Sequence, residues 1–254
     1  MKIIKDISYS KYDNIDKKLD LYLPKSDNFP IFVYFHGGGI EKGDKQSAEA
    51  FAPYLADKGI AIASVNYRMY PQAIYPEFIM DAAESVAWIK NNISNYGNCT
   101  DIYVGGSSAG GYLSMMLCFD SRFLAPYKIS PMDIKAFIHD AGQPTCHFNV
   151  LRERGIDKKR VIIDSSAPLY HIGTSDTYPD MLFIVSDNDM ENRYEQTMLM
   201  ISTLKHFGHT EPKINHIVMH GKHCEYVRKI NENNIPVFGE IVYNYIDSLK
   251  KDVN

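Results

Sequence analysis

The stretch Gly105-Gly106-Ser107-Ser108-Ala109-Gly110-Gly111 follows directly on the apolar run Ile102-Tyr103-Val104. This order predicts a short strand, a sharp glycine-rich turn and a helix that runs from Ala109 to about Phe119. Residues 106–110 match the pattern G-x-S-x-G, with Ser108 at the centre. A serine at such a turn is held in a strained backbone conformation that presents its hydroxyl away from the sheet, and the flanking glycines avoid steric clashes. Ser108 is therefore the candidate nucleophile.

Two further features of this stretch bear on that choice. Ser107 is the alternative serine, but its frame ends in Ala109 where the pattern requires glycine. The predicted helix begins directly after Ser108, so its first backbone N–H groups lack partners within the helix and its dipole presents a positive end. Both properties are suited to stabilising negative charge that develops beside Ser108.

The composition is that of an ordinary globular protein. The 254 residues are 45% hydrophobic and 23% charged, with a formal net charge of −4, which fits one α/β domain over residues 1–254. No basic run provides a nucleic-acid footprint, and no stretch reaches the ~20 apolar residues that cross a bilayer. The N-terminus lacks the apolar core of a signal peptide. The four cysteines show no pair spacing, so we expect reduced thiols in a cytoplasmic protein.

Strand-like and helix-like runs alternate along the chain. The apolar run from Pro30 to Phe35 is typical of a strand covered on both faces, and Glu77 to Asn92 has the pattern of an amphipathic helix. Further strands are expected at 3–9, 18–23, 60–65, 102–105, 136–139, 181–185 and 214–219, and further helices at 47–58, 109–119, 193–206 and 236–250. This alternation predicts an α/β fold in which a mainly parallel central sheet has helices on both faces. Residues 143–168 fit no strand position and are expected to form a small cap-like insertion over the site.

A serine hydroxyl is a poor nucleophile at neutral pH and needs a base, an orienting acid and donors for the oxyanion. This architecture places them in the chain order serine, acid, histidine. After the strand 181–185 comes Ser186-Asp187-Asn188-Asp189, in which two carboxylates compete. Asp189 lies where the loop has left the strand and is the favoured acid, whereas Asp187 is expected to cap the turn. The sequence alone leaves this choice open.

Two histidines follow the last predicted strand. His223 lies beyond the turn at Gly221 and is the favoured base, whereas His220 is expected to belong to the strand end. The other histidines are expected to be structural or surface residues, and they are His36, His139, His147, His171, His206, His209 and His216.

The loop after the strand 30–35 carries His36-Gly37-Gly38-Gly39. Consecutive glycines let backbone N–H groups approach a tetrahedral oxygen that side chains would otherwise block. Gly38 and Gly39 are the predicted oxyanion donors, with the N–H of Ala109 as a third. His36 is expected to fix this loop by hydrogen bonds and not to act as the base.

These residues resemble the α/β-hydrolase superfamily, in the esterase/lipase branch with an H-G-G-G oxyanion loop. The resemblance covers nearly the whole chain and includes Asn66-Tyr67-Arg68, Pro71 and Asp81; Arg68 and Asp81 are expected to form a structural salt bridge. The chain begins almost at the first strand, without the long N-terminal cap of hormone-sensitive-lipase-like members. In this respect it is similar to the small acetyl xylan and feruloyl esterases. The resemblance implies the same set of site residues: Ser108, Asp189, His223, Gly38, Gly39 and Ala109.

The resemblance implies a serine carboxylesterase that cleaves a small-molecule ester through an acyl-enzyme intermediate. The expected acyl groups are short, such as acetyl, and the alcohol is a sugar or another small alcohol. An amidase such as an arylformamidase is the alternative enzyme, and a ligand-binding protein on a hydrolase scaffold is the non-enzymatic alternative. Cys146 and His147 adjoin, but no second ligand pair follows at zinc-like spacing, so we expect no metal and no organic cofactor. No nucleic-acid or membrane partner is expected, and a homo-oligomer is compatible with the sequence.

Overall fold

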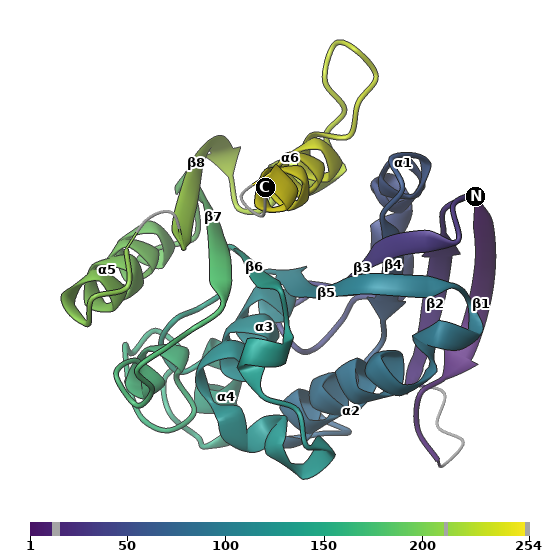
Figure 1. Cartoon of the computed structure of the whole chain (residues 1–254). Coiled ribbons are helices and arrows are strands. Elements are labelled where there is room, and N and C mark those ends of the chain that lie inside the picture. Colours follow the sequence, from purple (N-terminus) through teal and green to yellow (C-terminus); the bar gives the residue numbers. More distant parts are fainter. Residues whose placement is uncertain (12–15, 211–212, 252–254) are drawn as a thin grey trace.

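One sheet forms the centre of the structure, a computed structural model that describes residues 1–11, 16–210 and 213–251. Within these residues, eight strands lie in the order β1-β2-β4-β3-β5-β6-β7-β8 (Figure 1). The strands are β1 (Lys2–Ser8), β2 (Lys18–Leu23), β3 (Asn28–Phe35), β4 (Ala61–Val65), β5 (Asn98–Ser107), β6 (Ala136–Asp140), β7 (Asp180–Asn188) and β8 (Ile214–Lys222).

Most of the sheet is parallel. β1 pairs antiparallel with β2, and β2 pairs antiparallel with β4. From β4 to β8, every neighbouring pair is parallel, so the predicted mainly parallel sheet is confirmed. Because parallel strands end at one edge, the loops after β3, β5, β6, β7 and β8 gather there, where open α/β sheets hold their ligands.

Helices cover both faces of this sheet. They are α1 (Ala52–Asp57), α2 (Glu77–Asn92), α3 (Ala109–Phe119), α4 (Phe148–Glu153), α5 (Arg193–His206) and α6 (Val237–Lys251). Figure 1 shows α1 and α6 on one side and α2, α3 and α4 on the other. None of the helices in the described ranges combines the length and the apolar character needed to span a bilayer.

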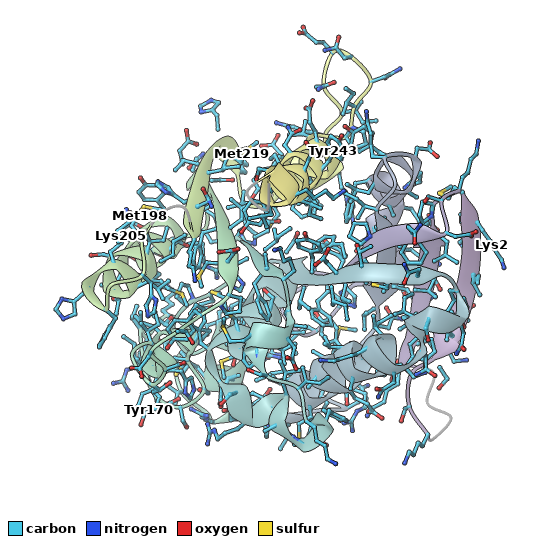
Figure 2. All side chains as sticks on the ribbon, viewed as in Figure 1. Lys2, Tyr170, Met198, Lys205, Met219 and Tyr243 are labelled. Atoms are coloured by element: carbon cyan, nitrogen blue, oxygen red, sulfur yellow. The ribbon has the colours of Figure 1, made fainter. Side chains whose placement is uncertain are left out.

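The two faces of β3 show how the layers are held together. Ile31, Val33 and Phe35 pack in the apolar cluster formed with α2, α3 and α5, whereas Phe32 and Tyr34 pack in the cluster formed with α1 and α6. All five side chains are almost completely buried. Successive side chains of a strand point to opposite faces, so one continuous apolar run supplies both layers. Side chains fill the space on each side of the sheet (Figure 2).

The continuous helix expected over residues 47–58 is wrong. A 3-10 helix, η1 (Lys45–Ala50), is followed by the separate helix α1. Phe51 stands between them with φ −138°, outside the helical range, and Pro53 occupies the first turn of α1. Proline has no N–H and is tolerated at the first turn of a helix but not in its interior, so the chain starts a new helix there.

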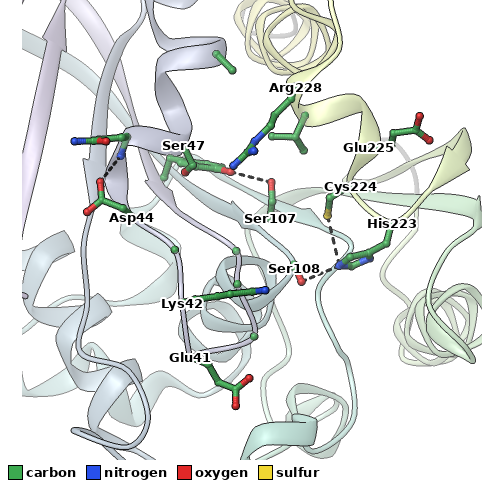
Figure 3. A pocket seen from close by; sticks show the side chains of 18 of the residues that line it. Glu41, Lys42, Asp44, Ser47, Ser107, Ser108, His223, Cys224, Glu225 and Arg228 are labelled. Carbon is green, nitrogen blue, oxygen red and sulfur yellow. Dashed lines mark hydrogen bonds between the residues drawn. The ribbon is translucent and has the colours of Figure 1, made fainter.

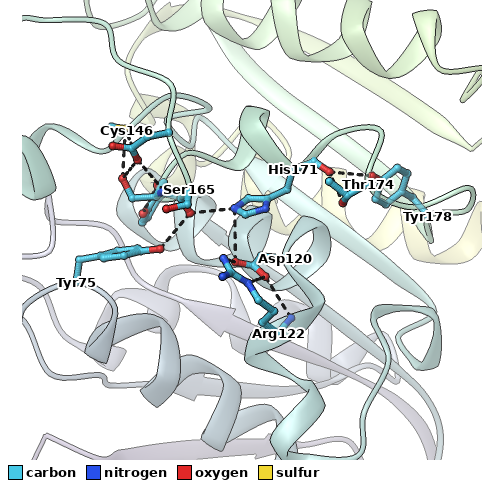
Figure 4. Close-up of polar contacts among 11 residues, drawn as sticks. Tyr75, Asp120, Arg122, Cys146, Ser165, His171, Thr174 and Tyr178 are labelled. Carbon is cyan, nitrogen blue, oxygen red and sulfur yellow. Dashed lines mark hydrogen bonds and ion pairs between the residues drawn. The ribbon is translucent and has the colours of Figure 1, made fainter.

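Residues 143–168 contain the helix α4 and a small apolar cluster made of Cys146, Leu151 and Ala167. The carbonyl oxygen of Ser165 accepts hydrogen bonds from the Tyr75 hydroxyl at 3.1 Å and from Nε2 of His171 at 2.9 Å (Figure 4). The same nitrogen of His171 lies 3.5 Å from the carboxylate of Asp120, which directly follows α3. These contacts tie the end of the segment to α3 and to the loop before α2.

The predicted pair of Arg68 and Asp81 is confirmed. Nε and Nη2 of Arg68 donate to the two carboxylate oxygens of Asp81, each at 2.8 Å. Lys17 adds a second cation, with Nζ 2.7 Å from Oδ1 of Asp81, whose side chain is buried. A planar guanidinium and a carboxylate form two parallel bonds of this kind with defined geometry, so the pair fixes α2 against the loop after β4.

Candidate active site

Ser108 lies at the turn between β5 and α3, with φ 56° and ψ −111°. A positive φ is unfavourable for a residue with a side chain and persists only where the surroundings impose it. The end of β3 packs closely against the turn and imposes it here, since a Cβ at Gly106 would lie 2.5 Å, and one at Gly110 1.9 Å, from the carbonyl oxygen of Phe35. The backbone N–H of Ser108 donates to the carbonyl oxygen of Asp140 at 2.7 Å. The elbow is therefore fixed from both sides.

The side chains of the two neighbouring serines have different partners. Oγ of Ser108 lies 2.8 Å from Nε2 of His223. Oγ of Ser107 accepts a hydrogen bond from the buried hydroxyl of Tyr34 at 3.1 Å. Of the two serines, Ser108 is the one that the fold places against the histidine.

A chain of hydrogen bonds joins Ser108, His223 and Asp189. Nδ1 of His223 lies 2.5 Å from Oδ1 of Asp189. When Nδ1–H donates to this carboxylate, Nε2 is left to accept the proton of the serine hydroxyl. The side chain of Asp189 is 1% exposed and that of His223 is 22% exposed, so the histidine faces the solvent side and the acid is shielded from water.

The surroundings of Asp189 keep its carboxyl ionised. Burial alone raises its pKa, but the hydrogen bond and charge of His223 and the backbone N–H groups of Met190 and Ser186 lower the pKa by more, so that it lies below its ordinary value. These N–H groups donate at 2.7 and 3.2 Å. An ionised acid at this position can stabilise a positively charged imidazole.

Asp187 and His220 form a separate pair at the surface. Oδ2 of Asp187 lies 2.7 Å from Nδ1 of His220, and Oδ1 accepts the backbone N–H of Gly221 at 3.0 Å. His220 belongs to the end of β8, as predicted, and its side chain is 98% exposed. Asp187 was expected to cap its own turn, but it bonds across to β8, because β7 runs on through Asn188.

The glycine loop after β3 passes beside Ser108. A Cβ at Gly37 would lie 3.2 Å from Cβ of Ser108. Gly38 and Gly39 have φ of +118° and +68°, and the carbonyl oxygen of Gly38 accepts the N–H of Lys42 at 3.1 Å. A Cβ at Gly38 would lie 1.8 Å from the carbonyl oxygen of Lys42. Only glycine fits this turn.

Three backbone N–H groups are left over around the elbow. Among the hydrogen bonds of the described residues, none uses the N–H of Gly38, Gly39 or Ala109. Ala109 is the first residue of α3, where helix N–H groups have no partner within the helix. These groups are therefore free to donate to an oxygen atom bound beside Ser108.

His36 is buried where this loop begins. Its ring stacks on Tyr67 with the ring centroids 4.5 Å apart, and its carbonyl oxygen accepts the Tyr67 hydroxyl at 2.8 Å. Nδ1 lies 2.7 Å from the carbonyl oxygen of Gly37. Burial lowers the pKa of His36, although the contact with Gly37 opposes this. A neutral, packed imidazole holds the loop in place, away from the reacting serine.

Ser108 and His223 line a cleft of about 1160 Å³ (Figure 3). Arg228 points into it from the 3-10 helix η7 (Glu225–Arg228), and Lys42 points into it from the glycine loop. Other polar side chains in the wall are Glu41, Asp44, Gln46, Ser47, Glu49 and Glu225. Phe148 of α4 and Met190 add apolar surface. The segment 143–168 therefore contributes to the cleft through Phe148.

In this site the carboxylate of Asp189 contacts His223, and His223 contacts the hydroxyl of Ser108. Within the described ranges, no three histidine, cysteine or carboxylate side chains gather closely enough to hold a metal ion. The chemistry that this arrangement can perform is nucleophilic attack by an activated serine.

Comparison of the sequence with known proteins identifies its family. A sequence model of the BD-FAE family matches residues 19–204. The chain belongs to the BD-FAE family. The matched residues include the Ser108 elbow and Asp189 and end before His223, so this BD-FAE member carries its histidine beyond the family match.

Two curated relatives are similar over about half of this chain. The probable carboxylic ester hydrolase LipM of Mycobacterium tuberculosis is 31% identical over 142 residues, which cover 52% of this chain and 33% of LipM. The kynurenine formamidase of Danio rerio is 30% identical over 135 residues, which cover 52% of this chain and 44% of the formamidase. The matched part of the chain thus spans a third to less than half of the length of these relatives.

A solved structure extends the likeness to the whole fold. The crystal structure of esterase B from Lactobacillus rhamnosis matches with a TM-score of 0.79 and 18% identity, over 99% of this chain and 86% of that chain. The α/β-hydrolase fold that the sequence motifs predict is therefore confirmed.

Two residues next to the site, Asp140 and Tyr226, are not predicted by the sequence analysis. Asp140, the last residue of β6, lies one position beyond the predicted strand 136–139. Tyr226 follows His223 by three positions, and its hydroxyl donates to the carboxylate of Asp140. The sequence indicates Asp140 only by its position. An acidic residue at the carboxyl end of a central parallel strand lies at the edge of the sheet where ligand sites form.

Proposed function

We propose that this protein is a serine carboxylesterase that hydrolyses esters of short acyl groups through an acyl-enzyme intermediate. The observation that carries the proposal is the chain of hydrogen bonds from Ser108 through His223 to Asp189, placed at a strained elbow that lines a cleft. The relationship to a probable carboxylic ester hydrolase supports it.

In the first step, Oγ of Ser108 attacks the ester carbonyl while Nε2 of His223 takes the hydroxyl proton. Asp189 holds Nδ1–H and stabilises the imidazolium that forms. The tetrahedral intermediate then collapses: the bond to the alcohol oxygen breaks, and the alcohol leaves with the proton from His223. Water repeats the sequence on the acyl-enzyme and releases the carboxylic acid. The chain itself supplies each group that these steps need.

The negative charge of the tetrahedral oxygen needs donors that are in place before the reaction. We assign this role to the N–H groups of Gly38, Gly39 and Ala109, which have no other partner in the described residues. Fixed donors stabilise a developing oxyanion without reorganisation, and one of them contributes about 10²–10³ in kcat.

We infer that the substrate is small and polar, with an acetyl or similarly short acyl group and a hydroxyl-rich alcohol such as a carbohydrate. The cleft wall supports this, because most of its side chains are polar and charged. Apolar side chains such as Phe148 and Met190 also line the cleft and offer surface to the acyl group, since burial of apolar surface favours binding.

Hydrolysis of p-nitrophenyl acetate, butyrate and octanoate by the wild type, Ser108→Ala and Ser94→Ala tests this proposal. Ser94 is exposed, does not line the cleft and precedes β5, whereas Ser108 follows it, so it is the matched control. We expect the rates to be highest on the short esters, to fall at least about 10⁴-fold in Ser108→Ala, and to be unchanged in Ser94→Ala. A fluorophosphonate should label the wild type and not Ser108→Ala. Equal rates in wild type and Ser108→Ala would refute the mechanism and favour a binding protein on this scaffold.

An amidase is the second candidate, because the kynurenine formamidase of Danio rerio is 30% identical over 135 residues. The same three side chains can serve an amide bond. Rates on formanilide and on phenyl acetate separate the two activities: a kcat/KM that is higher for the amide would replace the esterase proposal. Release of acetate from acetylated xylo-oligosaccharides tests the carbohydrate part.

A further inference from the structure

Asp140 lies between the elbow that carries Ser108 and the loop that carries His223. Its backbone carbonyl accepts the N–H of Ser108 at 2.7 Å. Its carboxylate accepts a hydrogen bond from the hydroxyl of Tyr226, three residues after the histidine. Sγ of Cys224, the residue directly after the histidine, lies 4.0 Å from Oδ2 of the same carboxylate. One residue thus contacts both of the loops that must meet for proton transfer.

The ionised carboxylate of Asp140 lowers the stability of the fold in its present surroundings. The residue is completely buried, and the ion pairs of the described residues give it no lysine or arginine partner. Hydroxyl groups satisfy it instead: Ser107 bonds to it, and Ser107 in turn accepts the hydroxyl of Tyr34 at 3.1 Å. Burial raises the pKa of Asp140 to about 6, although the bonds from Ser107 and Tyr226 oppose this shift. A buried carboxylate without a cation lowers stability, so its presence beside the reacting residues calls for another role.

The backbone around Asp140 is held rigidly. The next residue, Ala141, has φ 48°, its N–H donates to the carbonyl oxygen of Ile184 in β7 at 2.7 Å, and its carbonyl oxygen accepts the buried guanidinium of Arg193 in α5. A non-glycine residue keeps such a conformation only where its neighbours impose it. The position of Asp140 is therefore set by β7 and α5, independently of the loops that it contacts.

We propose that Asp140 is a positioning residue, which sets the separation of Ser108 and His223 by binding the elbow through its carbonyl and the histidine loop through its carboxylate. This proposal rests on the function proposed above. The ionised carboxylate accepts the hydroxyls of Ser107 and Tyr226 together, whereas the protonated form must donate from one oxygen and loses an acceptor. The loop that carries His223 then loses its fixed position, and turnover falls with it.

Several other groups face this carboxylate and bear on its ionisation. Tyr226 and Cys224 approach from the loop after β8, and Ser107 approaches from β5. The charge of His223 lowers the pKa of Asp140, and the charge of Asp189 raises it. Because the proposed positioning needs an ionised Asp140, we expect protonation of this carboxylate to steepen the fall of kcat on the acid limb.

The experiment compares pH profiles of kcat for p-nitrophenyl acetate in the wild type, Asp140→Asn, Tyr226→Phe and Tyr245→Phe. In Asp140→Asn we expect kcat to fall roughly 10- to 100-fold, the cost of a misplaced reacting group, with KM changed by less than about threefold. The acid limb should become less steep than in the wild type, and the melting temperature at pH 8 should not fall. A merely structural aspartate would lower the melting temperature and leave the slope unchanged.

Tyr226→Phe is the second variant, and it keeps the carboxylate. It removes a hydrogen bond that lowers the pKa of Asp140, so the acid limb should shift to higher pH and kcat should fall. Tyr245→Phe is the matched control, because its buried hydroxyl has no hydrogen-bond partner and it lies in α6.

The outcomes separate this proposal from the proposed function. If Asp140→Asn folds and keeps kcat within twofold with an unchanged slope, Asp140 is not a positioning residue. If Asp140→Asn does not fold, an unchanged profile in Tyr226→Phe overturns the proposal equally. In both cases Ser108→Ala remains inactive, whereas an active Ser108→Ala refutes the esterase mechanism itself.

Discussion

Replacing Asp189 by asparagine tests the geometry of the site most directly. Oδ1 of Asp189 lies 2.5 Å from Nδ1 of His223, and its side chain is 1% exposed, so water cannot take over this contact. An asparagine amide can donate to Nδ1, so the imidazole carries its proton on Nε2 instead. A protonated Nε2 can no longer accept the proton of Ser108. In a serine protease the corresponding exchange lowers kcat by about 10⁴. At about 1.4 kcal/mol for each factor of ten, this is about 5 kcal/mol of activation free energy.

The assay is steady-state hydrolysis of p-nitrophenyl acetate by the wild type, Asp189→Asn and Asp187→Asn. Asp187 offers a matched control, since it is the neighbouring carboxylate, 43% exposed, and pairs with His220, which is 98% exposed. This pair lies at the surface and contacts neither Ser108 nor His223, so we expect Asp187→Asn to retain kcat within about twofold. A loss of less than tenfold in Asp189→Asn, or a larger loss in Asp187→Asn, would refute the assignment of the acid.

Three further predictions concern packing, the glycine loop and acid stability. Gly110→Ala puts a Cβ 1.9 Å from the carbonyl oxygen of Phe35, and we expect urea unfolding to show a loss of about 3 kcal/mol; an unchanged midpoint would contradict this packing. Gly38→Ala puts a Cβ 1.8 Å from the carbonyl oxygen of Lys42, so kcat/KM should fall about 100-fold through displaced oxyanion donors, and full activity would remove the loop from the mechanism. The pKa of Asp140 is raised from 3.8 to about 6, so its contribution to stability is fully present below about pH 4 and is lost as the pH rises through 6, a change of about 3 kcal/mol. Urea titrations give the unfolding free energy of Asp140→Asn minus that of the wild type, and we expect this difference to be more positive at pH 8 than at pH 4. An equal difference at both pH values would count against the raised pKa.

Much of the fold could be predicted because its decisive signals are local. The glycines around Ser108 are required by backbone atoms of adjacent elements, so their spacing identifies the elbow without knowledge of distant contacts. The helices Glu77–Asn92 and Arg193–His206 have the bounds that their sequence patterns predict. The strand 30–35 was recognisable as doubly covered because both of its faces are apolar.

The rest depends on contacts between residues far apart in the chain. The bond of Tyr226 to Asp140 joins positions 86 residues apart, and neither residue has a local pattern that indicates the other. The choice between Asp187 and Asp189 is similar, because it depends on how far β7 continues before the chain turns. The break at Phe51 shows the limit for helices, since composition favoured one helix and Pro53 divided it. Packing across the sheet decides such cases, and a single sequence does not display it.

The position of β8 in the sheet has a consequence for how the protein loses activity. β8 is the last strand in the order and pairs with β7 alone, and alternate residues along it face solvent. Ser108, in contrast, follows the central strand β5. Edge elements with exposed backbone bonds open in local fluctuations at lower free energy than the centre of a sheet. Warming should therefore release His223 from Ser108 while the centre of the fold is intact, so that amide hydrogens of β8 exchange before those of β5 and inactivation precedes global melting.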